Sequence, residues 1–201
     1  MLRAGLTGGF GTGKTFVGEA LEALGCHLVR ADQLGHQVLA PGGEAYAGVL
    51  REFGPDILEP DGTIDRRRLA AMVFEDAERL ERLNRLVHPP VIRRGEELAR
   101  QWAERDPEGI LLFEAAILIE TDSHQRFDRI VLAVCGREQQ IERAMRRDGL
   151  SRQEVLARLA RQMPLEEKRK FADYVIDTSG SKEETLRQVR RTYEALRSIQ
   201  L

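Results

Sequence analysis

The chain has 201 residues, of which 42% are hydrophobic, and this length can bury one sizeable core without requiring a second independent domain. Its 31 basic and 33 acidic residues give a formal net charge of −2, so no global field would hold the protein on nucleic acid or an anionic membrane. No apolar run approaches the roughly 20 residues that span a bilayer, and the N-terminus lacks a signal-like apolar stretch. We therefore expect a cytoplasmic protein, a monomer or weak homo-oligomer, with no nucleic-acid or membrane partner.

The N-terminal part of the chain predicts a strand over residues 2–6, a helix over 14–24 that ends at Gly25, and a strand over 27–31. From Asp32 to about residue 105 the pattern predicts an almost entirely helical stretch. Turn-forming residues predict breaks in it at 41–43, 61–62 and 88–90.

The C-terminal half alternates strands and helices. Continuous apolar runs of the kind buried on both faces of a parallel sheet predict strands at residues 109–113, 129–135 and 174–176. The helical period predicts helices at 138–147, 151–162, 165–172 and 182–199. Five strands joined by helical crossovers predict a doubly wound parallel α/β fold.

The two cysteines, Cys26 and Cys135, lie far apart inside apolar stretches. They lack the spacing of a zinc site or a redox pair, and two cysteines cannot form a multi-bridge disulfide framework. We expect both to be buried free thiols.

Residues 8–15, Gly-Gly-Phe-Gly-Thr-Gly-Lys-Thr, fit the G-x-x-x-x-G-K-[ST] phosphate loop, a match that chance would give with a probability on the order of 0.002. The loop lies between a predicted strand and helix, where backbone amides converge on phosphate oxygens. Lys14 can reach the β and γ phosphates of ATP, and the Thr15 hydroxyl can complete the shell of Mg²⁺. The alternative is a glycine-rich turn that opens a helix beside an ordinary exposed lysine.

Two acidic residues close predicted strands at the edge where ligands of open α/β sheets bind. Asp32 could accept the proton of an acceptor hydroxyl, or it could be the N-cap of the following helix, and spacing alone favours neither role. Glu114 lies where P-loop proteins often place a carboxylate for magnesium or its waters, but a solvated strand-end carboxylate fits the sequence equally well.

A basic cluster follows the fourth strand and comprises Arg137, Arg143, Arg146, Arg147, Arg152, Arg158 and Arg161. Such guanidinium groups on a helical pair could close over ATP and neutralise charge on the transferred phosphoryl group. A solvated helix face, paired with Glu138, Glu142 and Asp148, is the competing interpretation.

The residues together resemble the bacterial dephospho-CoA kinase family over nearly the whole chain, to about Gly180. Beyond the phosphate loop, the matching segments are Ala31-Asp32, Phe53-Gly54, Asp61-Gly62-Thr63-Ile64-Asp65-Arg66, Arg68-Leu69, Val73-Phe74, Leu83-Asn84, His88-Pro89, Gln162 and Ala172-Asp173-Tyr174-Val175-Ile176-Asp177. The resemblance implies transfer of the ATP γ-phosphate to the ribose 3′-hydroxyl of dephospho-CoA, which gives coenzyme A and ADP.

The resemblance also implies roles for individual residues. Asp32 matches the catalytic base, Lys14 and Arg143 match transition-state stabilisers, Arg147 is a further lid arginine, and His88 faces the acceptor. The implied nucleotide contacts are Gly8, Gly9, Gly11, Thr12, Gly13, Lys14, Thr15 and Phe16 in the loop, and Asp177 and Thr178 near the ATP base. One P-loop kinase domain is implied, with a core of 1–31, 109–136 and 173–201, a helical acceptor-binding insertion at about 32–108 and a lid at about 137–172.

Some positions depart from the family pattern. Phe16 replaces a second hydroxyl after the loop, so its phosphate contact must come from the backbone, and Arg30 replaces the first Asp of Asp-Ala-Asp. Residues 116–120 read Ala-Ile-Leu-Ile-Glu instead of Pro-Leu-Leu-Phe-Glu, and Thr178 replaces a common Asn. Whether Glu114 or Glu120 contacts the magnesium shell is left open by the sequence.

Three functions fit the residues: a kinase that forms coenzyme A, another small-molecule P-loop kinase, or a nucleotide-dependent switch without a dedicated acceptor. The long helical insertion and the lack of an Asn-Lys-x-Asp sequence argue against the switch. Without the resemblance, His88 before two prolines is better explained as a helix-boundary residue than as a catalyst.

Overall fold

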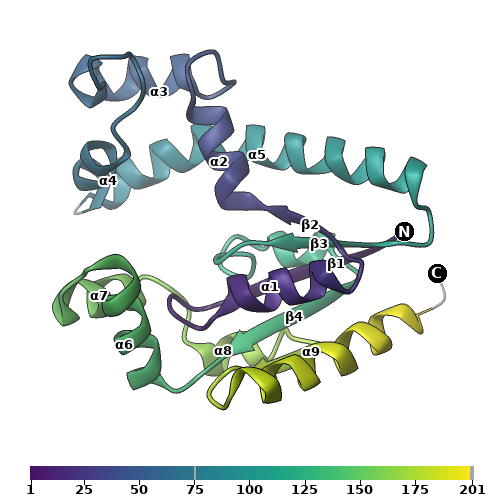
Figure 1. The fold of residues 1–201 in the computed structure, drawn as a ribbon. Coiled ribbons are helices and arrows are strands. Elements are labelled where there is room, and N and C mark those ends of the chain that lie inside the picture. The colour runs from purple at the N-terminus through teal and green to yellow at the C-terminus, as the bar shows by residue number, and fades with distance from the viewer. Residues whose placement is uncertain (75, 200–201) are drawn as a thin grey trace. The chain divides into compact units, whose positions relative to one another are not determined.

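The computed structural model describes residues 1–74 and 76–199 and divides into two compact units (Figure 1). Unit 1 comprises Met1–Val29 together with the chain from Gln101 onward, and unit 2 comprises Arg30–Arg100. No helix in these two described ranges is both long and apolar enough to cross a membrane.

A five-stranded sheet forms the centre of unit 1. Its strands are β1 (Leu2–Gly8), β2 (His27–Arg30), β3 (Ile110–Glu114), β4 (Arg129–Val134) and β5 (Tyr174–Asp177), in the order β2-β3-β1-β4-β5. β1 pairs in parallel with β3 and β4, and β4 pairs in parallel with β5. The doubly wound α/β fold predicted from the sequence is confirmed, and the strand boundaries differ from the prediction by one or two residues.

Helices α1 (Lys14–Ala23) and α9 (Lys182–Arg197) cover one face of the sheet and pack against each other (Figure 1). Val17 and Leu21 of α1 and Val189 of α9 join the even-numbered residues of β1 in the main apolar core. Alternating positions of a strand face opposite sides of the sheet, and a Cβ added at Gly5 of β1 would lie against Leu118 and Phe127 on the other side. Both faces are therefore covered, which explains the continuous apolar strands.

Three helices lie between β4 and β5: α6 (Arg137–Asp148), α7 (Arg152–Leu159) and α8 (Leu165–Arg169). Ser151 is the N-cap of α7 and forms a reciprocal capping box with Glu154. A small apolar cluster holds α6 to α7 and also contacts Phe10 of the phosphate loop; its buried members are Ile141, Ala144 and Val155. The two free cysteines are both buried, as the sequence predicted.

Unit 2 consists of α2 (Ala31–Leu39), α3 (Tyr46–Phe53), a 3₁₀ turn (Pro55–Ile57), α4 (Arg66–Phe74) and most of α5 (Ala77–Arg105). It has its own apolar core, whose buried residues are Val38, Ala45, Val49, Phe53, Ile57, Ile64, Leu69 and Val73. The breaks predicted at 41–43 and 61–62 fall between helices and are confirmed.

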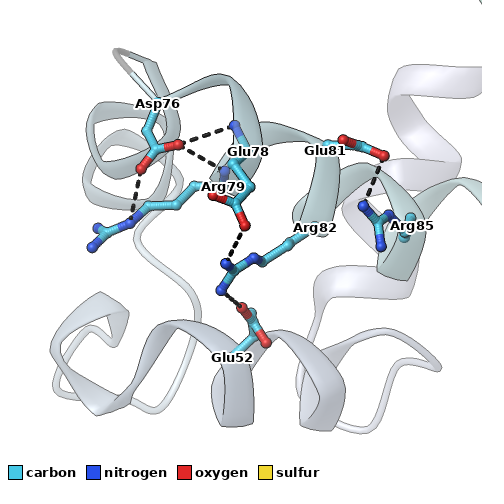
Figure 2. A network of polar contacts seen from close by, with 7 residues as sticks. All are labelled: Glu52, Asp76, Glu78, Arg79, Glu81, Arg82 and Arg85. Carbon is cyan, nitrogen blue, oxygen red and sulfur yellow. Dashed lines mark hydrogen bonds and ion pairs between the residues drawn. The ribbon is translucent and has the colours of Figure 1, made fainter.

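Ion pairs reinforce the start of α5 on the surface of unit 2 (Figure 2). Asp76 accepts the amides of Glu78 and Arg79 at 3.0 Å each, and so satisfies donors of the first helical turn. Arg82 donates to Glu78 in its own helix at 2.6 Å and to Glu52 of α3 at 3.1 Å. The last contact ties α5 to α3.

The break predicted at 88–90 is wrong, because α5 continues through Pro89 and Pro90. His88 therefore lies inside a helix and is not a helix-boundary residue. Proline removes a backbone donor and usually ends a helix, but apolar side chains on both sides of this pair pack against the same core. Those side chains are Leu80, Leu83, Leu86, Val87 and Val91. Tertiary packing thus outweighs the local cost of the prolines.

We predict that Pro89→Ala stabilises the protein. Pro89 is exposed, so its ring fills no core space, whereas Pro90 is buried. Inside a helix, proline is about 3 kcal/mol less favourable than alanine. Proline also restricts the unfolded chain, and the loss of this restriction in the variant costs about 1 kcal/mol of stability. The free energy of unfolding should therefore rise by about 1–2 kcal/mol. Urea unfolding followed by circular dichroism measures this change. Gln101→Ala, at an exposed position of the same helix, should change stability little; a loss of stability in Pro89→Ala would contradict the prediction.

Candidate active site

The phosphate loop connects the end of β1 to the start of α1, and it forms a turn rather than an extended segment. The Gly9 carbonyl accepts both the amide of Thr12, at 3.3 Å, and its hydroxyl, at 2.9 Å. Gly11 and Gly13 have φ angles of 78° and 79°, in the left-handed region where a Cβ is disfavoured. The glycine spacing of the motif therefore has a direct conformational cause.

The loop presents main-chain donors at the N-terminus of α1. The amide of Val17 bonds to the Gly13 carbonyl at 3.2 Å, which is the first hydrogen bond of the helix. The three preceding amides, of Lys14, Thr15 and Phe16, have no carbonyl partner within the helix. The first turn carries no acidic side chain that would neutralise the positive end of the helix dipole. This arrangement is suited to binding a phosphate group.

Lys14 and Glu114 form a nearly dry ion pair at the end of the loop. The Lys14 Nζ lies 2.6 Å from Glu114 Oε1, and the two side chains are 11% and 5% exposed. The Thr15 hydroxyl donates to the same carboxylate oxygen at 3.3 Å. The solvated strand-end interpretation of Glu114 is therefore wrong, because β3 lies inside the sheet between β2 and β1. The carboxylate orients the two side chains that the motif assigns to phosphate and metal.

Arg143 of α6 reaches the loop through Thr178. Its guanidinium donates to the Thr178 hydroxyl at 2.9 Å and to the Thr178 carbonyl at 2.7 Å. The Thr178 hydroxyl in turn donates to the Thr12 carbonyl at 2.7 Å. Beside it, hydrogen bonds from Ser179 lower the pKa of Asp177, with smaller effects of arginine charges. The segment after β5 thus connects α6 to the phosphate loop.

Phe10, at the tip of the loop, is held through its main chain and its ring. Its amide donates to Gln162 Oε1 at 2.8 Å, and its carbonyl accepts from Gln140 Nε2 at 2.9 Å. The guanidinium groups of Arg147 and Arg158 lie 5.3 and 5.4 Å from the ring centroid, within cation–π range. The sequence pattern indicates no role for Phe10 or Gln140, and Gln162 stands out in it only as a family match.

The basic cluster divides between two roles. Arg143 contacts the site, and Arg147 and Arg158 stack on Phe10. In contrast, Arg152 pairs with Glu138 at 2.8 Å on the surface, and Arg147 also bonds the Asp148 carboxylate at 2.8 Å, which lowers the pKa of Asp148. The solvated-face interpretation holds for Arg152 and is wrong for Arg143.

Lys168 and Glu120 form a second ion pair, which no sequence pattern predicts. Lys168 is fully buried on α8, and its Nζ lies 2.8 Å from Glu120 Oε1. Burial lowers the pKa of Lys168, and the nearby Lys14 charge lowers it further, while the bond to Glu120 raises it. The available signal was composition, because the chain contains only four lysines among its 31 basic residues.

Asp32 and His88, both expected to face the acceptor, belong to unit 2. Asp32 is the second residue of α2, whose N-cap is Arg30, so the N-cap interpretation of Asp32 is wrong. Near it, Arg66 contacts His36; burial and the Arg66 charge lower the pKa of His36, and Asp32 raises it. His88 lies within α5, where burial lowers its pKa.

The five-stranded sheet and the phosphate loop ending in Lys14 and Thr15 define the class of protein: a nucleotide-binding phosphotransferase of the P-loop kinase type. The sequence model of the family described as dephospho-CoA kinase matches residues 2–184. The chain belongs to this dephospho-CoA kinase family, a family of ATP-dependent kinases.

Individual relatives agree with the family match. A dephospho-CoA kinase from Aquifex aeolicus is 38% identical over 98% of both chains, and one from Geobacter sulfurreducens is 40% identical over 94% of this chain and 95% of the relative. The crystal structure of a Thermus thermophilus protein has a TM-score of 0.82 and 34% identity, with 96% of each chain covered. Similarity therefore extends over nearly the whole chain and over its fold.

We predict that Gly11→Ala weakens nucleotide binding. A Cβ at Gly11 would overlap the main-chain carbonyl of Gln140, and the left-handed conformation itself costs a non-glycine residue about 1–2 kcal/mol. Calorimetric titration with ADP and magnesium should give an affinity lower by about tenfold or more. Gly136→Ala is the control, because Gly136 has an ordinary φ of −59° and space for a Cβ. Wild-type affinity in Gly11→Ala would contradict this account of the loop.

Proposed function

We propose that this protein catalyses ATP-dependent phosphorylation of the ribose 3′-hydroxyl of dephospho-CoA, which yields coenzyme A and ADP. The main support is the match of residues 2–184 to the family, together with a phosphate loop whose Lys14 lies ready beside Glu114. In the reaction, the acceptor oxygen forms a bond to the γ-phosphorus, and the bond from that phosphorus to the β,γ-bridging oxygen breaks. The hydroxyl proton passes to a base on the protein, and ADP leaves.

In this proposal Lys14 and the amides at the start of α1 bind the β- and γ-phosphates. Lys14 exchanges part of its contact with Glu114 for phosphate oxygens, so Glu114 orients the ammonium before the nucleotide arrives. Arg143 stabilises charge on the transferred group. Its guanidinium bonds Thr178, and Thr178 in turn bonds Thr12 of the loop. Such preorganised charges act most strongly where water is excluded.

Asp32 is proposed as the catalytic base. It follows the last residue of β2 by two positions, and the carboxyl ends of strands are where ligands of open α/β sheets bind. A carboxylate there can accept the proton of the acceptor hydroxyl or orient the hydroxyl for in-line attack. Because α2 begins at Ala31, Asp32 is not the N-cap, and its exposed side chain lies in the first turn of the helix.

The residues present fit a magnesium ion. Mg²⁺ prefers oxygen ligands and usually keeps several waters and phosphate oxygens, and the Thr15 hydroxyl and Glu114 carboxylate supply oxygens within 3.3 Å of each other. Thr15 would hold the ion, and Glu114 would hold the ion or its waters; Glu120, which bonds Lys168, is not part of this proposal. The bound ion would neutralise charge on the β- and γ-phosphates.

Other residues would recognise the nucleotide and the acceptor. We propose that Asp177 and Thr178 lie near the ATP base and that Phe16 contributes its amide to phosphate binding. Arg147 would act from the lid at 137–172, and His88 would contact the acceptor. The helical insertion at about 32–108 would bind dephospho-CoA. A cytoplasmic location belongs to the same proposal, because ATP and dephospho-CoA are intracellular substrates. A monomeric or weakly oligomeric state stays a prediction.

An acceptor panel tests the activity. With ATP and magnesium, ADP release should be far faster with dephospho-CoA than with adenosine, AMP or shikimate, because dephospho-CoA is the acceptor that the name of the matched family gives. A coupled assay for ADP measures all four rates. Equal or absent turnover with dephospho-CoA would overturn the acceptor assignment, and preference for another alcohol would favour a different small-molecule kinase.

Asp32→Asn tests the base. The substitution keeps the size of the side chain but removes its ability to take a proton, so kcat should fall by about a hundredfold or more, with the affinity for ATP retained. Steady-state kinetics and ADP titration separate the two quantities. Glu19→Gln, at an exposed position of α1, controls for the loss of one negative charge. An unchanged kcat would show that Asp32 is not the base.

A further inference from the structure

The fully buried lysine of α8 is difficult to explain by stability alone. Removing an ammonium from water is costly unless it is paired and hydrogen-bonded, and a well-packed apolar side chain is often at least as stabilising. The other two basic residues around the end of α8, Arg169 and Lys170, are exposed and pair with neighbouring glutamates. Lys168 alone is turned inward, with none of its side chain exposed.

All three N–H donors of the Lys168 ammonium have acceptors in unit 1. The closest are the Ala116 carbonyl at 2.7 Å and Glu120 Oε1 at 2.8 Å. The third is the carbonyl of Gly8 at 3.4 Å, a longer contact that is mainly electrostatic. Ala116 and Glu120 follow β3, whereas Gly8 ends β1 and is the first residue of the phosphate loop. One charged group thus joins three segments.

Glu120 extends this junction toward the lid. The same Oε1 atom that contacts Lys168 accepts the amide of Met163 at 3.0 Å. The residue before Met163 is Gln162, whose side chain accepts the Phe10 amide in the phosphate loop. The segment from 162 to 168 therefore contacts the loop at both of its ends, through Gln162 at Phe10 and through Lys168 at Gly8. Glu120 bonds the same segment at Met163 and Lys168.

We propose that Lys168 is a positioning residue for nucleotide binding, which holds the start of the phosphate loop and the 162–168 segment in one arrangement. It does not contact the reacting atoms and acts through the main chain of Gly8 and Ala116. The inference rests on the proposed function only in that the loop binds ATP. Lys168 and Glu120 form a second ammonium–carboxylate pair, and this pair supports the loop in which Lys14 pairs with Glu114.

Lys168→Met tests the proposal, because methionine fills a similar volume and carries no charge. Calorimetric titration with ADP and magnesium, without acceptor, should give an affinity at least about tenfold lower than wild type. The KM for ATP should rise similarly, with the KM for dephospho-CoA changed less than about twofold. Lys170→Met is the matched control, since Lys170 is exposed and pairs with Glu167 on the surface, and it should bind ADP as wild type does.

A purely structural role predicts a different result. Lys168→Met would then melt at a lower temperature, but at temperatures well below melting its ADP affinity and KM for ATP would equal those of wild type. That outcome would overturn the proposal. Lys168→Arg keeps the charge, and we expect it to recover part of the lost affinity.

Glu120→Gln gives an independent measurement if Lys168→Met does not fold. It keeps the side-chain volume and an acceptor oxygen but removes the charge that pairs with Lys168, so ADP affinity should fall by about threefold or more. Wild-type affinity in a folded Glu120→Gln protein would also overturn the proposal. Failure of the wild-type protein to bind ADP would instead count against the proposed function, so the two can be distinguished.

Discussion

The pair formed by Lys14 and Glu114 sets the conditions for the rest of the site. Both groups are nearly removed from water, and a buried pair of this kind repays its desolvation only when its geometry is fixed and further hydrogen bonds surround it. The sheet supplies that fixation, since Glu114 closes a central strand and Lys14 opens the helix that follows the neighbouring strand. The Thr15 hydroxyl bonds the same carboxylate, and the Thr178 hydroxyl holds the loop at Thr12, two residues before Lys14.

Contacts with the loop come from segments far apart in sequence. Gln140, Gln162 and Lys168 lie 130, 152 and 160 residues from the loop residues that they bond. All three lie on α6, on α8 or between α7 and α8, so the same part of the chain that carries the arginines also shapes the loop. Because these side chains bond the loop backbone directly, a movement of these helices would displace the loop.

The contrast between what the sequence predicts and what it misses follows from the range of the interactions. Strands and the phosphate loop are predicted well, because periodicity and glycine spacing are local properties. No local pattern contains the strand order and long-range packing that bury Glu114 and Lys168. The hydrogen bond from the Phe10 amide to Gln162 depends on the same long-range packing. The sequence wrongly predicts a break at Pro89 and Pro90 for the same reason, since packing against the core of unit 2 outweighs the tendency of proline to end a helix.

The separate core of unit 2 has a consequence for how such an enzyme can evolve. The described residues of its apolar core all lie within residues 30–100, and none of them belongs to the sheet core of unit 1. The surface ion pairs at the start of α5 lie in the same range (Figure 2). Energetic effects of substitutions at distant sites with no shared partners are usually additive. Mutations within unit 2 can therefore accumulate at little cost to the stability of the sheet, so that descendants of this chain can diverge in one half while they preserve the other.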